Sequence, residues 1–205
     1  MGGGKFAGLL VSLFRSAWDF VGYFDDVVSR GYVEDVCGIP HWGRSSEAAA
    51  LRERCSVCII SVGSEGDLEP RRRYFDWFRQ AGYTLPRLIH PGAQVFSDPE
   101  TFGAGVIVLP GAVVDPRVVL GDNTVVSRQS LVGHDSLVGA HSFLAPGVLM
   151  NGSVRIGEQT FLGTGAIVLP QLTVGARVLV AAGACVTKDV ASGSVVMGVP
   201  ARERS

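Results

Sequence analysis

The sequence has few cysteines, no excess of charge of either sign and no long apolar run. Four cysteines among 205 residues are too few for the disulfide scaffold of a small secreted protein. The 18 basic residues balance 19 acidic ones, which argues against a basic face for nucleic acid. No apolar run reaches the roughly 18 residues needed to span a bilayer. We therefore expect neither a nucleic-acid partner nor a membrane-spanning protein.

Two short motifs near the start have ordinary explanations. Cys55 and Cys58 have C-x-x-C spacing, but no second pair or nearby histidine completes a zinc site, so we interpret them as core thiols. The apolar run at 6–14 follows Lys5 and faintly resembles a signal peptide. Arg15 interrupts the run and no clear cleavage site follows, so we favour an amphipathic helix in a cytoplasmic protein.

Residues 1–90 alternate between helix-like and strand-like segments. Capping residues and spacing predict three helices, over 6–16, 45–54 and 70–80. Short apolar runs predict three strands, over 19–24, 57–62 and 84–89. This alternation is typical of a small α/β, Rossmann-like subdomain with parallel strands.

From about residue 95 onward the sequence has a period of six. Stepping by six from Phe96 to Val186 meets sixteen large apolar residues in succession. About one residue in three here is of such a type, so chance agreement is on the order of 10⁻⁸ before the choice of frame. A short strand plus a turn explains the period, with three repeats in each triangular coil. Residues 91–205 are therefore predicted to form a parallel β-helix, with about five coils over 96–189.

The hexapeptide pattern resembles the left-handed parallel β-helix of the hexapeptide acyltransferases, and the handedness is taken from that resemblance. Motifs of both halves, read in order, narrow the resemblance. They are Gly2–Ala7, Tyr23–Asp26, Ser61–Gly63, Leu88–Pro91, Val132–Asp135 and Val195–Arg202. With these motifs in this order, the chain resembles the PglD/NeuD-type bacterial sugar acetyltransferases over nearly its whole length. The resemblance implies a homotrimer that binds acetyl-CoA between neighbouring β-helices.

The resemblance also implies that the amino-terminal domain holds a nucleotide-linked amino sugar. Its expected contacts are Gly2, Gly3, Gly4, Asp25, Asp26 and Gly63. A glycine-rich turn at a helix start presents N–H groups to a diphosphate, and a carboxylate about 20 residues on can accept from ribose or base. One feature departs from the family: the glycine turn should follow a strand, and only Met1 precedes it.

His134 is the candidate general base. It lies two residues past the inward Val132, which places it near a corner of the prism. An amine that attacks a thioester must lose a proton, and imidazole is suited to accept it near neutral pH. By resemblance His134 is that base and Asp135 orients it, whereas His41 and His90 are interpreted as structural.

The acetyl-CoA contacts implied by the family are matched in part. Many members carry a second histidine nine residues after the base, and here that position is Phe143. His141 is out of register by two and is not given this role. Three small residues fall where the family lines the groove for acetyl-CoA: Gly152, Thr164 and Ala182.

These observations together favour an acetyl-CoA-dependent N-acetyltransferase acting on a nucleotide-linked amino sugar, of the UDP-4-amino-dideoxy sugar type, by direct transfer and without a metal. Two alternatives stay open: an O-acetyltransferase of a sialic-acid-like sugar, and a non-catalytic sugar-binding or oligomerisation module. A zinc enzyme of the γ-carbonic-anhydrase type needs three histidines, and the repeat holds only His134 and His141.

Overall fold

The structure, a computed structural model, describes residues 4–26, 38–63 and 66–204. The chain divides into two compact units, the first made of Met1–Glu65 with Pro70–Pro86 and the second of Gly66–Glu69 with Arg87–Ser205. The boundary that the sequence placed at residue 90 therefore falls a few residues inside the second unit.

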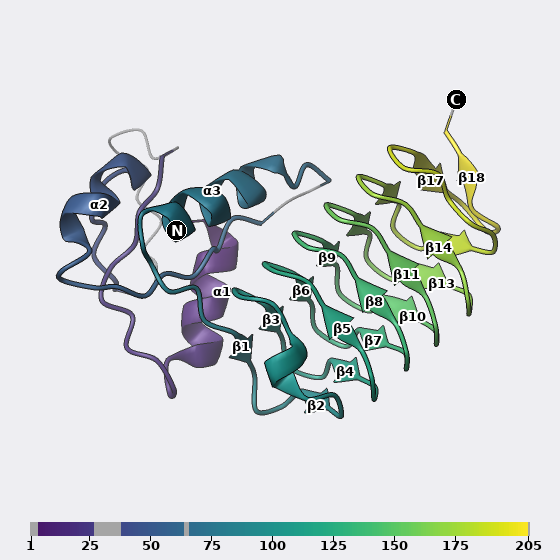
Figure 1. The fold of residues 1–205 in the computed structure, drawn as a ribbon, viewed down its shortest axis with the longest axis horizontal. Helices are drawn as coiled ribbons and strands as arrows, with labels where there is room; N and C mark the ends of the chain where they lie inside the picture. The colour runs from purple at the N-terminus through teal and green to yellow at the C-terminus, as the bar shows by residue number, and fades with distance from the viewer. Residues whose placement is uncertain (1–3, 27–37, 64–65, 205) are drawn as a thin grey trace. The chain divides into compact units, whose positions relative to one another are not determined.

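The three predicted helical segments are present (Figure 1). They are α1 (Lys5–Phe14), the 3-10 turn η1 (Ser45–Glu47) running into α2 (Ala48–Leu51), and α3 (Glu69–Gln80). Helix α1 buries Ala7, Leu10, Val11 and Phe14, which recur at three- and four-residue spacing. This apolar face on one side of the helix explains why the segment is ordered against a core.

The predicted strands of the first unit are reduced to isolated parallel bridges, Tyr23 with His41 and Val57 with Thr84. The predicted strand over 84–89 is split in two, because Thr84 pairs within the first unit while Leu88–Ile89 forms β1 of the second. Pro86 lies between them and has no N–H for a ladder, which explains the interruption.

An apolar cavity of about 120 Å³ lies within the first unit. Its walls come from α1 and from both bridged pairs, including Leu10, Tyr23, Ile39, Val57 and Tyr83. The cavity is therefore lined by residues of α1 and of both bridged pairs.

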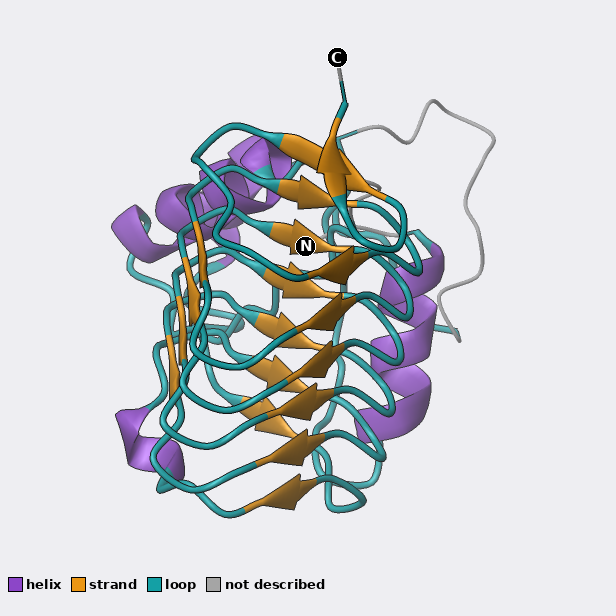
Figure 2. Ribbon diagram, turned by 90° about the vertical axis from the view of Figure 1, so that its right-hand side faces the viewer, coloured by secondary structure: helices purple, strands orange, loops and turns teal. Residues whose placement is uncertain are grey.

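The second unit is a left-handed parallel β-solenoid of three sheets and about six turns, so the predicted fold class is confirmed (Figures 1 and 2). The eight-stranded sheet contains β1 (Leu88–Ile89), β3 (Ile107–Val108), β6 (Val125–Val126), β9 (Phe143–Leu144), β12 (Phe161–Leu162), β15 (Leu179–Val180), β17 (Val195–Met197) and the antiparallel β18 (Arg202–Glu203).

The other two sheets complete each turn. The six-stranded sheet contains β2 (Gln94–Val95), β4 (Val113–Val114), β7 (Leu131–Val132), β10 (Leu149–Met150), β13 (Ile167–Val168) and β16 (Cys185–Val186). The four-stranded sheet contains β5 (Val119–Leu120), β8 (Leu137–Val138), β11 (Arg155–Ile156) and β14 (Thr173–Val174). A further 3-10 turn, η2 (Pro99–Thr101), lies in the first coil.

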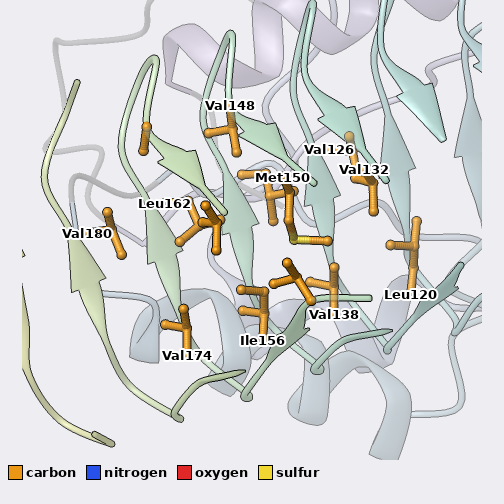
Figure 3. Packing of buried hydrophobic residues seen from close by; sticks show 14 of the residues in the cluster. Leu120, Val126, Val132, Val138, Val148, Met150, Ile156, Leu162, Val174 and Val180 are labelled. Atoms are coloured by element: carbon orange, nitrogen blue, oxygen red, sulfur yellow. The ribbon is translucent and has the colours of Figure 1, made fainter. Parts of the chain in front are cut away.

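The apolar residues at six-residue spacing point into the solenoid and form one continuous core (Figure 3). Fourteen of the sixteen, from Val108 to Val186, are at most 1% exposed, and Phe102 is 2% exposed. Phe96 is the exception, at 61% exposed. Strand β2 pairs Val95 with Val114, and this step along the chain is one residue longer than the next one, from Val114 to Val132. Val95 therefore takes the inward place that the repeat assigned to Phe96.

Candidate active site

Each coil of the solenoid turns three corners, and the candidate residues lie on different ones. We call the turns between the six- and four-stranded sheets, at 115–118, 133–136, 151–154 and 169–172, the histidine corner. The turns between the eight- and six-stranded sheets, at 127–130, 145–148, 163–166 and 181–184, are the threonine corner. The remaining turns, at 121–124, 139–142, 157–160 and 175–178, are the third corner.

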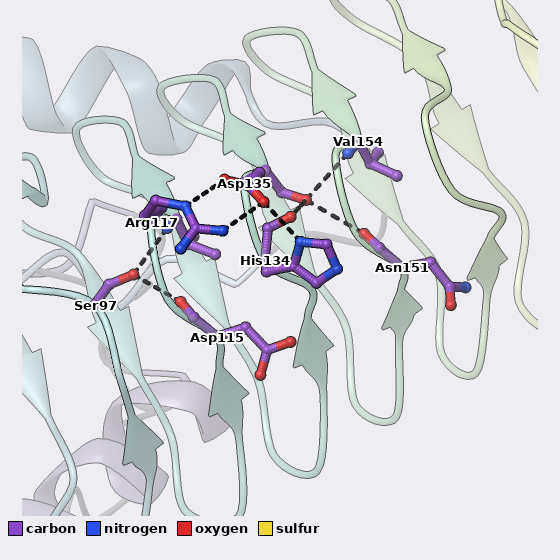
Figure 4. A network of polar contacts seen from close by, with 9 residues as sticks. Ser97, Asp115, Arg117, His134, Asp135, Asn151 and Val154 are labelled. Atoms are coloured by element: carbon purple, nitrogen blue, oxygen red, sulfur yellow. Dashed lines mark hydrogen bonds and ion pairs between the residues drawn. The ribbon is translucent and has the colours of Figure 1, made fainter.

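His134 and Asp135 form a hydrogen-bonded pair on the histidine corner (Figure 4). Nδ1 of His134 lies 2.7 Å from Oδ2 of Asp135, and the imidazole side chain is 57% exposed. An ionised carboxylate only accepts hydrogen bonds, so Nδ1 carries the proton and Nε2 of the neutral ring keeps its lone pair. The contact therefore holds the ring in the tautomer that a general base needs.

Gly152 lies one coil after His134 and keeps the space beside Nε2 open. A Cβ at this position would lie 2.5 Å from Nε2 and 2.7 Å from Cε1 of His134. Only a residue without a side chain leaves the imidazole in place here. The structure thus brings together three of the residues singled out in the sequence: His134, Asp135 and Gly152.

Arg117, which the sequence analysis did not single out, completes the cluster. Its Nε lies 2.5 Å from Oδ1 of Asp135 and its Nη2 lies 2.9 Å from Oδ2. The hydrogen bonds from Arg117, and then that from His134, hold the pKa of Asp135 well below its ordinary value. The sequence did contain a sign of this contact. Residues 117 and 135 are separated by one full coil, which places them at the same point of successive turns.

The remaining candidates for acetyl-CoA lie elsewhere on the solenoid. Thr164 and Ala182 are exposed and occupy successive turns of the threonine corner. Phe143 points outward from β9, where it is 8% exposed and stacks on Phe161 with ring centroids 5.8 Å apart. His141 lies on the third corner, with its Nδ1 3.1 Å from the side-chain amide nitrogen of Asn123. One chain therefore does not gather the predicted acetyl-CoA contacts at a single corner.

Of the predicted sugar contacts, Gly4 and Gly63 lie near the same end of α1. Gly4 is the N-cap of this helix, and a Cβ on Gly63 would lie 3.6 Å from Cβ of Phe6 in its first turn. Asp25 is half-buried, and its N–H donates to the carbonyl of Gly43. Gly2 and Gly3 lie outside the described residues.

Asp26 has an anchoring role that the sequence did not indicate. Its carboxylate accepts from the N–H of Ser45 at 2.7 Å, from the Ser45 hydroxyl at 2.6 Å and from the Tyr74 hydroxyl at 2.8 Å. Burial alone would raise the pKa of Asp26, but these hydrogen bonds and the charge of Arg44 outweigh it and lower the pKa. A carboxylate has about four acceptor positions, so about one remains for a ligand.

The other singled-out groups have local partners. Nδ1 of His90 accepts from the N–H of Gly92 at 2.9 Å, and the ring of His41 packs on Tyr23. Cys58 is buried, which raises the pKa of its thiol, whereas Cys55 is only half-buried.

Metal ligands and membrane-spanning helices can be assessed for the residues that the structure describes. Within those ranges, no group of three or more His, Cys, Asp or Glu side chains is placed to hold a metal ion. Among the helices described, none is long and apolar enough to cross a membrane.

Similarity to solved structures bears on the chain as a whole. No protein-family model matches the sequence, and no curated protein matches it. The perosamine N-acetyltransferase of Caulobacter crescentus, solved with CoA and GDP-perosamine, is 31% identical with a TM-score of 0.90, covering 100% of this chain and 94% of that one.

Two further structures superpose over the whole chain. The acetyltransferase domain of PglB from Neisseria gonorrhoeae, solved with acetyl coenzyme A, is 31% identical with a TM-score of 0.83, covering 99% of this chain and 97% of that one. WeeI from Acinetobacter baumannii is 22% identical with a TM-score of 0.85, covering 99% and 97%, and shares the fold.

Proposed function

The chain belongs to the sugar N-acetyltransferases of the hexapeptide, left-handed β-helix superfamily, and from that premise we propose that it transfers an acetyl group from acetyl-CoA to the amine of a nucleotide-linked amino sugar. His134 is the general base and Asp135 orients it. The nucleotide is UDP, as the resemblance implied, with GDP as the comparator because the C. crescentus relative was solved with a GDP-linked sugar.

The observation that carries the proposal is the open Nε2 of His134. The other ring nitrogen, Nδ1, is hydrogen-bonded to Asp135 at 2.7 Å. Gly152 leaves the space next to Nε2 clear. A base of this kind must reach the proton of the attacking amine, and an exposed ring nitrogen at a corner can do so. The absence of a Cβ at residue 152 also fits a thin thioester arm passing over the ring.

The chemistry assigned to this chain is proton transfer. Acetyl-CoA supplies an acetyl thioester as the group to be transferred. Nε2 of His134 accepts a proton from the sugar amine as its nitrogen bonds to the acetyl carbon and the carbon–sulfur bond breaks. The imidazolium, stabilised by Asp135, then returns that proton to the thiolate, so CoA leaves as the thiol and the ring is ready again.

We also propose that the enzyme is a homotrimer. The histidine corner holds His134 and Gly152, and the threonine corner holds Thr164 and Ala182. These are different corners of one prism, so an acetyl-CoA molecule flanked by both sets would lie between two copies of the chain.

The experiment is a thiol-release assay with acetyl-CoA and a panel of UDP- and GDP-linked amino sugars, CMP-sialic acid and free sialic acid. We expect turnover only with an amino sugar. His134→Ala should lower it about 10²–10⁴-fold while acetyl-CoA still binds, because the ring acts on the amine and not on the cofactor.

His141→Ala is the matched control, because this histidine lies on the third corner. Its turnover should stay close to that of the unaltered protein. Acetylation of a sialic acid alone would favour the O-acetyltransferase. Ligand binding without any thiol release would favour a non-catalytic module, and a dead His141→Ala with an active His134→Ala would contradict the assignment of the base.

A further inference from the structure

Arg117 and Asp135 occupy the same point of successive coils and form a two-pronged ion pair (Figure 4). Both residues have left-handed backbones, with φ of 62° and 60°. The guanidinium contacts both carboxylate oxygens of Asp135. Oδ2 also accepts a hydrogen bond from Nδ1 of His134. The three side chains therefore form one connected network of contacts, which ends at the imidazole of His134.

We propose that Arg117 is a positioning residue for the acetyl transfer, acting through Asp135: it fixes the carboxylate against His134 and balances its charge. The inference rests on the proposed role of His134 as the base. It adds a residue whose hydrogen bonds to Asp135 link it to the imidazole.

Stability does not explain the pair. The side chains of Arg117 and Asp135 are 70% and 39% exposed, and ion pairs at such sites contribute little to folding. A guanidinium that meets both carboxylate oxygens does, however, fix the orientation of the carboxylate as a single contact cannot. The orientation of Asp135 in turn sets the orientation of the imidazole.

The charges around the ring also assign a role to Arg117. An isolated carboxylate beside imidazole favours the protonated ring, which cannot accept a proton from an amine. Asp115 and Arg117 of the preceding turn lie beside this site (Figure 4). The following turn, residues 151–154, has no charged side chain. Arg117 is the one cation among the residues of these turns, and its contact with both oxygens of Asp135 places it to offset the charge of that carboxylate.

Substitutions of Arg117 and Asp135 should move the titration of the ring in opposite directions. Asp135 stays ionised wherever imidazole titrates, because its pKa is held well below the ordinary value, first by Arg117. Arg117→Met leaves that charge unbalanced, so the protonated ring is favoured and the acidic limb of the kcat/KM profile moves to higher pH. Asp135→Asn removes the anion, so the same limb moves to lower pH.

The test compares pH profiles of Arg117→Met, Arg117→Lys, Asp135→Asn and the double variant Arg117→Met/Asp135→Asn. An exposed ion pair corresponds to a shift of about 0.2–0.7 pH unit. We expect Arg117→Met to shift the limb upward by this amount and to lower kcat with little change in KM for acetyl-CoA. Arg117→Lys should recover part of the shift, since it keeps the charge but not the two-pronged contact.

The double variant decides whether Arg117 acts through Asp135. Its profile should match that of Asp135→Asn alone, because the arginine has then lost its partner. Additive shifts, a downward shift in Arg117→Met or no shift at all would overturn the proposal. Titration of the His134 ring followed by NMR gives the same readout without turnover, so it separates failure of this inference from failure of the proposed function.

Arg177→Met is the matched control. Arg177 also sits at a corner with positive φ, at 55°, is 64% exposed, and pairs with Glu158 at 3.8 Å, but on the third corner. Its loss should leave the pH profile unchanged. An equal shift in this variant would show a general effect of net charge and would also overturn the proposal.

Discussion

At the scale of single residues, two glycines on neighbouring turns of the histidine corner meet different surroundings. A Cβ on Gly152 would lie 2.5 Å from Nε2 of His134, at the movable end of a side chain. A Cβ on Gly133 would lie 2.5 Å from the carbonyl carbon of Asn151, which is backbone. The same added methyl group therefore displaces the ring in one case and strains the solenoid in the other.

We expect Gly152→Ala to lower turnover about 10²-fold, because misplacing a reacting group by about 1 Å has an effect of that order. Its free energy of unfolding should change by about 0.5 kcal/mol or less, since the ring can swing away. Gly133→Ala should instead lose about 1–3 kcal/mol of stability, as overpacking does. Turnover and urea unfolding of both variants provide the measurement.

Gly8→Ala serves as the control, because a Cβ there has nothing within 4 Å. Normal turnover in Gly152→Ala would show that the imidazole does not work from the position observed. A loss of folding in Gly152→Ala as large as that in Gly133→Ala would show that the site is rigid rather than open.

Sequence reasoning identified His134, Asp135 and Gly152 because each belongs to a motif or a repeat position. It did not find Arg117, since nothing local links that residue to Asp135, and only the winding of the coil brings them together. Asp26 was expected to contact the sugar nucleotide, but its hydrogen bonds to Ser45 and Tyr74 join residues far apart in the chain. Contacts of that kind depend on the packing of the unit and leave no mark on the local sequence.

At the scale of elements, the solenoid repeat departs from its regular step at both ends: in the last coil Val180 pairs with Val196, a shorter step, and in the first coil the step is longer. The step along the chain from Val95 to its partner Val114 is one residue longer than the step from Val114 to its partner Val132. The extra residue falls where η2 (Pro99–Thr101) makes its turn, before Phe102 resumes the inward register. Phe96 is thereby moved out of the core and Phe102 stays within it.

This offset gives a prediction for two phenylalanines, one on each side of η2. Phe102 is 2% exposed, so Phe102→Ala should lower the free energy of unfolding by ~3–5 kcal/mol. Phe96 is 61% exposed, so Phe96→Ala should change it by about 0.5 kcal/mol or less. Urea unfolding measures both. Equal losses would mean that the strict six-residue register, and not the offset one, describes the first coil.

Periodicity predicted the helices and the solenoid well and the short strands of the first unit poorly. Helices α1 and α3 and the solenoid rungs bury side chains at a fixed spacing, which is visible in the sequence. Thr84 and Leu88 were assigned to one strand because both lie in a single apolar run. They pair with different units, and a choice of partner of this kind is made by tertiary contacts.

At the scale of the whole molecule, the predicted acetyl-CoA contacts are divided between corners. Each contact has a position in the hexapeptide repeat, and the winding of three repeats into one coil assigns that position to a corner. What a single chain does not specify is which corners of different copies face each other. The proposed trimer supplies that pairing, and it makes the site a joint property of two chains.

Complementation between two inactive variants tests the pairing. His134→Ala lacks the base, and Thr164→Arg should block the threonine corner with a long charged side chain. In a trimer reassembled from an equal mixture, a site is intact when its histidine corner comes from Thr164→Arg and its threonine corner from His134→Ala. This combination occurs at about a quarter of the interfaces, so about a quarter of the original turnover should return. If both corners served acetyl-CoA within one chain, the mixture would stay as inactive as its parts, although light scattering still reported subunit exchange.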